Sequence, residues 1–255
     1  MNNEIYAVTE EEVDITTYMQ QQCVDSYLTV ASSLKSGMSE RAIEKAMKAE
    51  LALGGLKEFW YNIPVMVLVG EDRFRMMAAD DYDIKEPQEE IVLQPGMPFF
   101  IDMHPRHAQT GRWGNFAATG IFNPQDSEEA IKLLQEMQEI QLNGISSLRA
   151  DMAGADVAAM FDGKFGEAGI QLLDVRGNYG HSMGTGPKGS FQRAFLDANN
   201  AFSIGGQIFG IEPGGTRGLS VARFEDCVHI PDGSLEGQST ILGRTKPVPL
   251  VFGNS

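Results

Sequence analysis

The sequence predicts an α+β fold in which helices lie on one side of a curved antiparallel sheet. Segments with the helical spacing of apolar residues and segments rich in β-branched residues occur in groups, without strict βαβ alternation. The order of these groups is two helices, strands, two helices and more strands, a loose repetition without a period short enough for a solenoid. We therefore expect a single domain over residues 1–255.

Two helices are expected near the N-terminus, and both are interpreted as packing elements. The first follows the acidic residues 10–14 and ends before Gly37, with apolar residues spaced along one face. The second begins at Ser39, a residue type that caps helix N-termini, and ends at the glycine pair 54–55. The acidic run is interpreted as a solvated helix start that the helix dipole favours.

Strands and two further helices follow. Residues 63–69 form a nearly continuous β-branched run, which predicts a buried strand, and residues 70–78 are interpreted as its hairpin partner. Apolar residues at helical spacing predict an amphipathic helix over 126–148 and another helix over 155–165.

Two carboxylates stand out near the end of the chain, on short apolar runs at 208–212 and 221–228 that a glycine-rich turn connects. Strand alternation would point Glu212 and Glu225 toward one interior, where two unpaired carboxylates would repel each other and be poorly solvated. A cation or a proton is therefore expected between them.

Bulk composition excludes several classes of function. The chain carries 20 basic and 35 acidic residues, a formal net charge of −15, which would repel the phosphate backbone of a nucleic acid. No apolar run approaches the ~20 residues of a membrane helix, and the N-terminus lacks the features of a signal peptide, so we expect a cytoplasmic protein. Cys23 and Cys227 are interpreted as buried thiols.

Four segments of the sequence resemble the pita-bread metallohydrolases, the superfamily of methionine aminopeptidase, Xaa-Pro aminopeptidase, prolidase and creatinase. They are Phe99–Met103 after a Pro-Gly turn, Tyr179–Gly184, Glu212-Pro213 and Arg223–Asp226. They occur in the family's order across residues 60–233. The resemblance implies the pita-bread fold, without the separate N-terminal domain of the creatinase type.

The resemblance also implies a metal site. The matching positions are Asp102, His181, Glu212 and Glu225, and Asn115 is a possible weak ligand. One imidazole with several carboxylate oxygens suits a divalent ion such as manganese, iron, cobalt or zinc. One or two ions per chain are expected.

Asn115 departs from the family's pattern. Alignment of the segment 111–122 places Asn115 where the family has a second aspartate that bridges two metals, thirteen residues after Asp102 and about two more than usual. Asparagine offers one neutral carbonyl oxygen in place of two anionic ones, so a dinuclear site would lose its bridge. This substitution favours a single ion.

The resemblance gives roles to three residues. The family's counterpart of Glu212 is both ligand and proton shuttle, so general acid/base work is expected of Glu212, next to the ligand His181. Lys188 stands where the family has another catalytic histidine, and it is either a fixed positive charge for an anionic substrate or a surface residue. The family's substrate-contacting histidine is missing, because no histidine precedes His104.

Other charged residues keep more than one interpretation. His104 and His107 flank Pro105 and are interpreted as surface or pocket-rim residues. Arg217 and Arg223 suit either a substrate carboxylate or the bracing of a buried carboxylate.

The predicted function is that of a divergent metal-dependent hydrolase. A metal-activated water would attack a small amino-acid, dipeptide or amide-like substrate. Two alternatives stay open: a lyase-type metalloenzyme on the same fold, and a metal-free pseudo-peptidase that serves as a binding protein. A homodimer is plausible from the family, and no nucleic-acid or membrane partner is expected.

Overall fold

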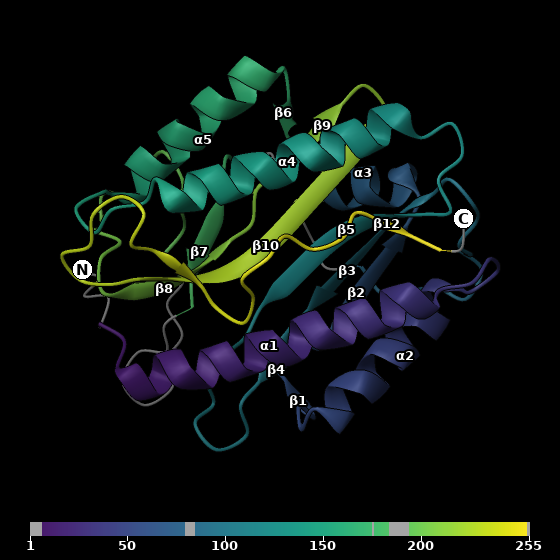
Figure 1. The fold of residues 1–255 in the computed structure, drawn as a ribbon, viewed down its shortest axis with the longest axis horizontal. Coiled ribbons are helices and arrows are strands. Elements are labelled where there is room, and N and C mark those ends of the chain that lie inside the picture. Colours follow the sequence, from purple (N-terminus) through teal and green to yellow (C-terminus); the bar gives the residue numbers. More distant parts are fainter. Residues whose placement is uncertain (1–6, 80–84, 175, 184–193, 254–255) are drawn as a thin grey trace.

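The computed structural model describes residues 7–79, 85–174, 176–183 and 194–253. For residues 77–79 it describes the backbone only. Figure 1 shows a long curved sheet with helices packed along it, two from the N-terminal part of the chain and two from the middle. The mixed α+β class is therefore confirmed. The four long helices are α1 (Glu10–Ser33), α2 (Glu40–Leu53), α4 (Glu128–Ser146) and α5 (Gly154–Ala168).

The main sheet is antiparallel along its central path, in the order β2-β3-β5-β10-β8-β7. The six strands of this path are β2 (Val65–Val69), β3 (Pro98–Met103), β5 (Phe116–Phe122), β10 (Ser220–Ile230), β8 (Gln207–Ile211) and β7 (Gly180–Ser182). Strand β10 crosses the molecule diagonally in Figure 1 and joins both halves of the sheet.

Short strands complete the architecture. Strand β1 (Glu58–Phe59) pairs with β4 (Pro105–Arg106), and β6 (Gln171–Leu172) pairs with β9 (Gly214–Arg217), which also pairs with β10. Strand β11 (Thr240–Ile241) pairs with β10. The C-terminal tail docks on its own chain, because β12 (Val251–Phe252) runs parallel to β5.

The main core lies between the long helices and the sheet. Tyr27 of α1 is fully buried and meets the rings of Phe116 and Phe252 edge-on at centroid distances of 5.7 Å. Cys23 and Cys227 are buried free thiols, as predicted, and burial raises the pKa of both. None of the helices described is both long and apolar enough to cross a membrane.

One predicted strand is a helix. Residues 70–78 do not form a hairpin with β2, whose antiparallel partner is β3; they form most of α3 (Glu71–Ala79). Within this helix Arg73 and Phe74 are buried: Arg73 makes two 3.0 Å bonds to Glu40, and Phe74 packs on Phe100. These contacts with α2 and the sheet stabilise the helix.

The first helix begins earlier than predicted. Thr9 is the N-cap and forms a capping box with Glu12, so the acidic run lies inside α1. Glu12 is also not simply solvated, because its Oε1 accepts a 2.7 Å bond from the buried Arg112.

Candidate metal centre

Three strands of the sheet bring three candidate ligands to one place. His181 lies on β7, Glu212 directly follows β8, and Glu225 lies on β10. Gly210 of β8 pairs with His181 on one side and with Cys227 on the other. Since residues two apart on a strand share a face, Glu212 and Glu225 lie on the same face as His181.

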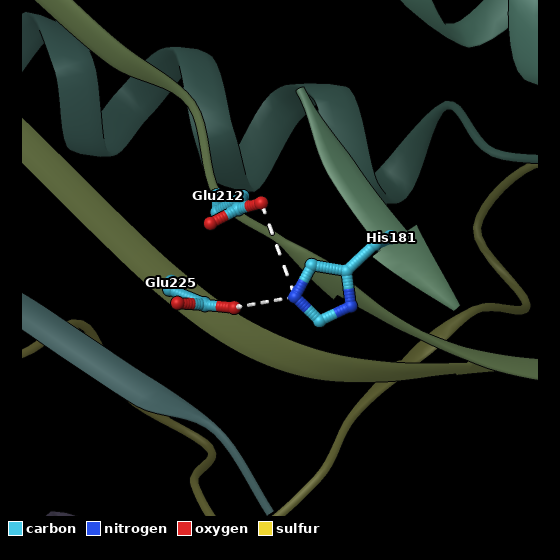
Figure 2. A group of neighbouring side chains, drawn as sticks. All are labelled: His181, Glu212 and Glu225. Carbon is cyan, nitrogen blue, oxygen red and sulfur yellow. Dashed lines mark ion pairs between the residues drawn. The ribbon is translucent and has the colours of Figure 1, made fainter. Parts of the chain in front are cut away.

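The three side chains point toward one another (Figure 2). Nε2 of His181 lies 4.0 Å from Oε1 of Glu212 and 4.0 Å from Oε1 of Glu225. The three ligand atoms all lie within 4.8 Å of one another, and Glu225 is fully buried. We call these three residues the glutamate side of the site.

The ring of His181 is held in the tautomer that a metal ligand needs. Its Nδ1 lies 3.1 Å from the carbonyl oxygen of Ser182, which can only accept, so Nδ1 carries the proton. Nε2 is the nitrogen that faces the two glutamates, and it would offer its lone pair to a bound ion. This orienting partner is of a kind that ligating histidines commonly have.

Gly210 makes room for the carboxylate of Glu225. A Cβ atom built on Gly210 would lie 2.7 Å from Oε1 of Glu225 and 3.5 Å from Sδ of Met183. Any side chain at position 210 would therefore displace the carboxylate from its place beside His181.

Arg223 braces both glutamates from the outside. Its Nη2 donates a short hydrogen bond to Oε2 of Glu212 and lies 3.7 Å from Oε2 of Glu225. The Oε1 atoms, which face His181, receive neutral amide donors: Asn178 at 3.3 Å on Glu212 and Asn115 at 2.6 Å on Glu225. The guanidinium and a metal ion would therefore use different oxygens.

Asp102 is not part of the ligand group found among the described residues. It shares the same sheet face, but Ala117 of β5 pairs with Asp102 on one side and with Glu225 on the other, which places β3 two strand spacings from β10, about 10 Å. Oδ1 of Asp102 lies 3.0 Å from Nε2 of His104, and Oδ2 lies 3.9 Å from Nη1 of Arg223. Burial raises the pKa of Asp102, but its close contact with His104 and the positive charge of Arg223 outweigh this, so the pKa lies below its ordinary value.

Asn115 lies between the two carboxylate groups. It stands two residues before Ala117, on the same face, and it is buried. Its Nδ2 donates to Glu225, and its Oδ1 is buried with no hydrogen-bond partner among the residues that the structure describes. We call Asp102, His104 and Asn115 the aspartate side of the site.

The glutamate side fits one divalent ion. Ligand atoms lie about 2.0–2.2 Å from an ion such as zinc, so two ligands of one ion lie at most about 4.4 Å apart, and both 4.0 Å separations meet this limit. The unpartnered carbonyl oxygen of Asn115 adds a neutral donor nearby. On the aspartate side, His104 faces Oδ1 of Asp102 and Arg223 faces Oδ2.

Several residues near the site were missed or misjudged from the sequence. His104 was expected at the surface or rim, yet it is only 2% exposed because its ring packs against Tyr61 at 4.7 Å. Asn178 was not predicted, although an Asn two residues before a glycine is a turn signal. Arg217 pairs with Glu136, away from the cluster.

His107 lies apart from the cluster. His107 lies on the turn beyond β4, where its Nδ1 contacts Thr110 at 2.9 Å. Lys188, the candidate fixed charge, lies outside the described residues.

An aromatic stack adjoins the histidines. Trp60 stacks between Tyr61 and Trp113, at centroid distances of 3.9 Å and 4.3 Å. The Trp60 ring is also 5.4 Å from the ring of His104 and 6.4 Å from that of His181. The stack therefore forms an apolar wall beside the site.

Comparisons with known proteins place this geometry in a family context. A model of metallopeptidase family M24 matches residues 18–232. Among solved structures, X-Pro aminopeptidase from Thermotoga maritima matches 96% of this chain with a TM-score of 0.74 and 16% identity, over 64% of its own length. Dipeptidase PepE from Mycobacterium ulcerans also matches 96% of this chain, with a TM-score of 0.76 and 19% identity, over 61% of its own length. Methionine aminopeptidase from Thermotoga maritima matches over its whole length, with 94% of this chain, a TM-score of 0.76 and 16% identity.

These matches show the pita-bread fold that the sequence predicted. The chain spans less than two thirds of the length of the X-Pro aminopeptidase and of the dipeptidase. No curated protein sequence matches the chain.

Proposed function

The chain belongs to metallopeptidase family M24, and from that premise we propose that it is a hydrolase with one divalent metal ion, held by His181, Glu212 and Glu225. The substrate is a small molecule: an amino-acid derivative, a dipeptide or an amide-like compound. Its C–N bond is cleaved by water.

The main support for this proposal is that three ligand atoms of the glutamate side lie close together. Two nearly buried carboxylates and an oriented imidazole come from three separate strands, and their ligand atoms lie within 4.8 Å. Buried anions at such separations repel unless a cation or proton lies between them. Arg223 neutralises their outer oxygens only, which leaves the Oε1 atoms for an ion.

The chain's own groups suit hydrolysis around such an ion. When bound, a divalent ion supplies an activated water and polarises the substrate carbonyl. Glu212 is the group that would take the proton of that water and return it to the leaving nitrogen. Arg223 holds its Oε2. Asn178 keeps Oε1 oriented by its 3.3 Å bond.

The residues around the site also suggest which metals and which kind of substrate it would take. One imidazole with carboxylate oxygens suits manganese, iron, cobalt or zinc. The flat aromatic faces of the Trp60 stack, 6.4 Å from His181, favour a substrate with an apolar group next to the scissile bond.

A metal-free binding protein is the second candidate function, and one observation favours it. The guanidinium of Arg223 already contacts Glu212, Glu225 and Asp102, so the site contains an internal cation. In that case the carboxylates are structural partners of Arg223.

Metal analysis separates the two candidates. Protein purified without chelator should contain close to one divalent ion per chain, and it should hydrolyse members of a panel of dipeptides and amino-acid amides. His181→Gln should lose both properties, whereas His107→Gln, on the turn beyond β4, should keep both. Metal-free protein whose melting temperature does not respond to manganese, cobalt or zinc would reject the hydrolase and support the binding protein.

A further inference from the structure

Two asparagine side chains contact the glutamate oxygens that face His181. Nδ2 of Asn178 lies 3.3 Å from Oε1 of Glu212, and Nδ2 of Asn115 lies 2.6 Å from Oε1 of Glu225. Both asparagines are buried. Each glutamate therefore has its own amide donor, on the oxygen that lies 4.0 Å from Nε2 of the histidine.

The amide of Asn178 has a fixed orientation. Its Oδ1 accepts a 3.0 Å hydrogen bond from the backbone N–H of Gly180, a group that can only donate, so Nδ2 must face Glu212. The backbone carbonyl of the next residue, Tyr179, accepts a 2.9 Å bond from the N–H of Glu212. The segment before β7 thus holds Glu212 both at its backbone and at its carboxylate.

Tyr179 anchors the same segment to α5. Its ring lies 5.2 Å from that of Phe161 and 5.5 Å from that of Phe165, and its hydroxyl donates a 2.5 Å bond to Oδ1 of Asp162. These side-chain contacts involve none of the three candidate ligands. The hydroxyl of Tyr179 therefore offers a structural comparison for the amide of Asn178, one residue away.

A neutral donor suits an oxygen that also binds an ion. A carboxylate oxygen has two lone pairs, so one can accept an amide hydrogen while the other is offered to the ion. A cationic donor on the same oxygen would repel the ion at short range. Arg223, the cation beside the two glutamates, contacts their Oε2 atoms instead.

We propose that Asn115 and Asn178 are positioning residues, each of which holds Oε1 of one glutamate beside His181 and thereby sets the affinity of the site for its ion. The proposal rests on the proposed one-ion hydrolase. It gives Asn115 a role through its nitrogen, which is separate from the ligand role that its oxygen could have. Loss of such an outer-shell partner typically costs about 10–100-fold in metal affinity.

Asn178→Ser tests the role of Asn178. A serine hydroxyl can still accept the N–H of Gly180 in a turn, but its side chain is too short to reach Oε1 of Glu212. Calorimetric titration of the metal-free variant with manganese should show about 10-fold weaker binding. The control Tyr179→Phe loses the bond to Asp162, so it should lower the free energy of unfolding in urea and keep the manganese affinity.

Asn115→Ser tests the role of Asn115 in two backgrounds, the natural protein and Glu225→Ala. If Asn115 acts through Glu225, the substitution should weaken manganese binding about 10-fold in the natural protein and change it little where the carboxylate is already gone. A loss of equal size in both backgrounds would show that Asn115 binds the ion directly. Relaxation of water protons by bound manganese measures the weak affinity of the Glu225→Ala background.

The outcomes separate this proposal from the proposed function. A natural protein that binds no manganese contradicts the one-ion hydrolase itself. A natural protein that binds one ion, with Asn178→Ser binding it as tightly, overturns only the role of Asn178. An Asn178→Ser protein that circular dichroism shows to be unfolded would also overturn it, because the residue would then serve the fold. If Glu225→Ala binds no measurable manganese, the result for Asn178 decides the proposal.

Discussion

The two sides of the site lie on one face of one sheet, yet their carboxylates meet different neighbours. On the glutamate side, Oε1 of Glu212 and Oε1 of Glu225 both lie 4.0 Å from Nε2 of His181, which would offer its lone pair to a bound ion. On the aspartate side, Oδ1 of Asp102 lies 3.0 Å from Nε2 of His104, and Oδ2 lies 3.9 Å from Nη1 of Arg223.

A residue at a position where the family has a metal ligand therefore need not bind a metal. What decides is the group that faces the carboxylate. In both histidines Nδ1 faces a backbone carbonyl, that of Ser182 for His181 and that of Ile63 for His104. The two rings differ in the distance from Nε2 to the nearest carboxylate oxygen, which is 4.0 Å for His181 and 3.0 Å for His104. Arg223 contacts carboxylates on both sides, so its positive charge acts on both at once.

The largest expected effect on metal affinity comes from replacing Glu225, the most buried ligand of the glutamate side. Glu225→Gln removes a negative charge and a ligand oxygen while it keeps the shape of the side chain. Metal affinity should fall by more than the roughly 10–100-fold that loss of an outer-shell partner costs, as measured by calorimetric titration with manganese. Glu136→Gln, which alters only the ion pair with Arg217, is the matched control. Unchanged affinity in Glu225→Gln would remove this residue from the metal site.

The next effect concerns the cation that the two sides share. Arg223→Gln leaves three carboxylates without their buried partner, so the free energy of unfolding of the metal-free protein should fall by about 3–5 kcal/mol in urea. Addition of manganese should recover part of the loss, because the ion binds only the folded state.

Arg217→Gln is the control for that experiment. It breaks a pair whose side chains are 27% and 30% exposed, and it should cost less than about 1 kcal/mol. Equal losses in the two variants would show that Arg223 does not brace the site.

A smaller effect should follow from crowding Glu225 without changing any charge. Gly210→Ala would place a methyl group 2.7 Å from Oε1 of Glu225, so the carboxylate must shift away from His181. Manganese affinity should fall about 10-fold, at the lower end of the range for disturbed ligand orientation. Gly163→Ala, on α5 with nothing within 4 Å of the added carbon, should leave the affinity unchanged. An equal result for both glycines would mean that the carboxylate tolerates displacement.

The sequence predicted the fold class and the strands that carry Asp102, Glu212 and Glu225 because each signal was local, whereas His181 was expected on a glycine-rich loop and lies on β7. Alternation around Glu212 and Glu225 and the Gly-His-Ser segment of β7 depend on few neighbours. The α3 segment failed because its mixed apolar and charged residues suit a strand as well as a helix, and the contact of Arg73 with Glu40 comes from a distant helix.

The burial of His104 was beyond the reach of local patterns for the same reason. Its burial depends on Trp60 and Tyr61, which precede another strand, and the proton on its Nδ1 depends on the carbonyl of Ile63. Pro105 suggested a turn, but Pro105 and Arg106 form the short strand β4, which pairs with β1. Tertiary contacts therefore decided what this histidine faces.

The position of the bound metal tests the central claim most directly. Crystals grown with manganese should give a single peak in an anomalous difference map, within bonding distance of Nε2 of His181 and of Oε1 of Glu212 and Glu225. A peak beside Asp102, two peaks, or no peak at saturating manganese would contradict the account.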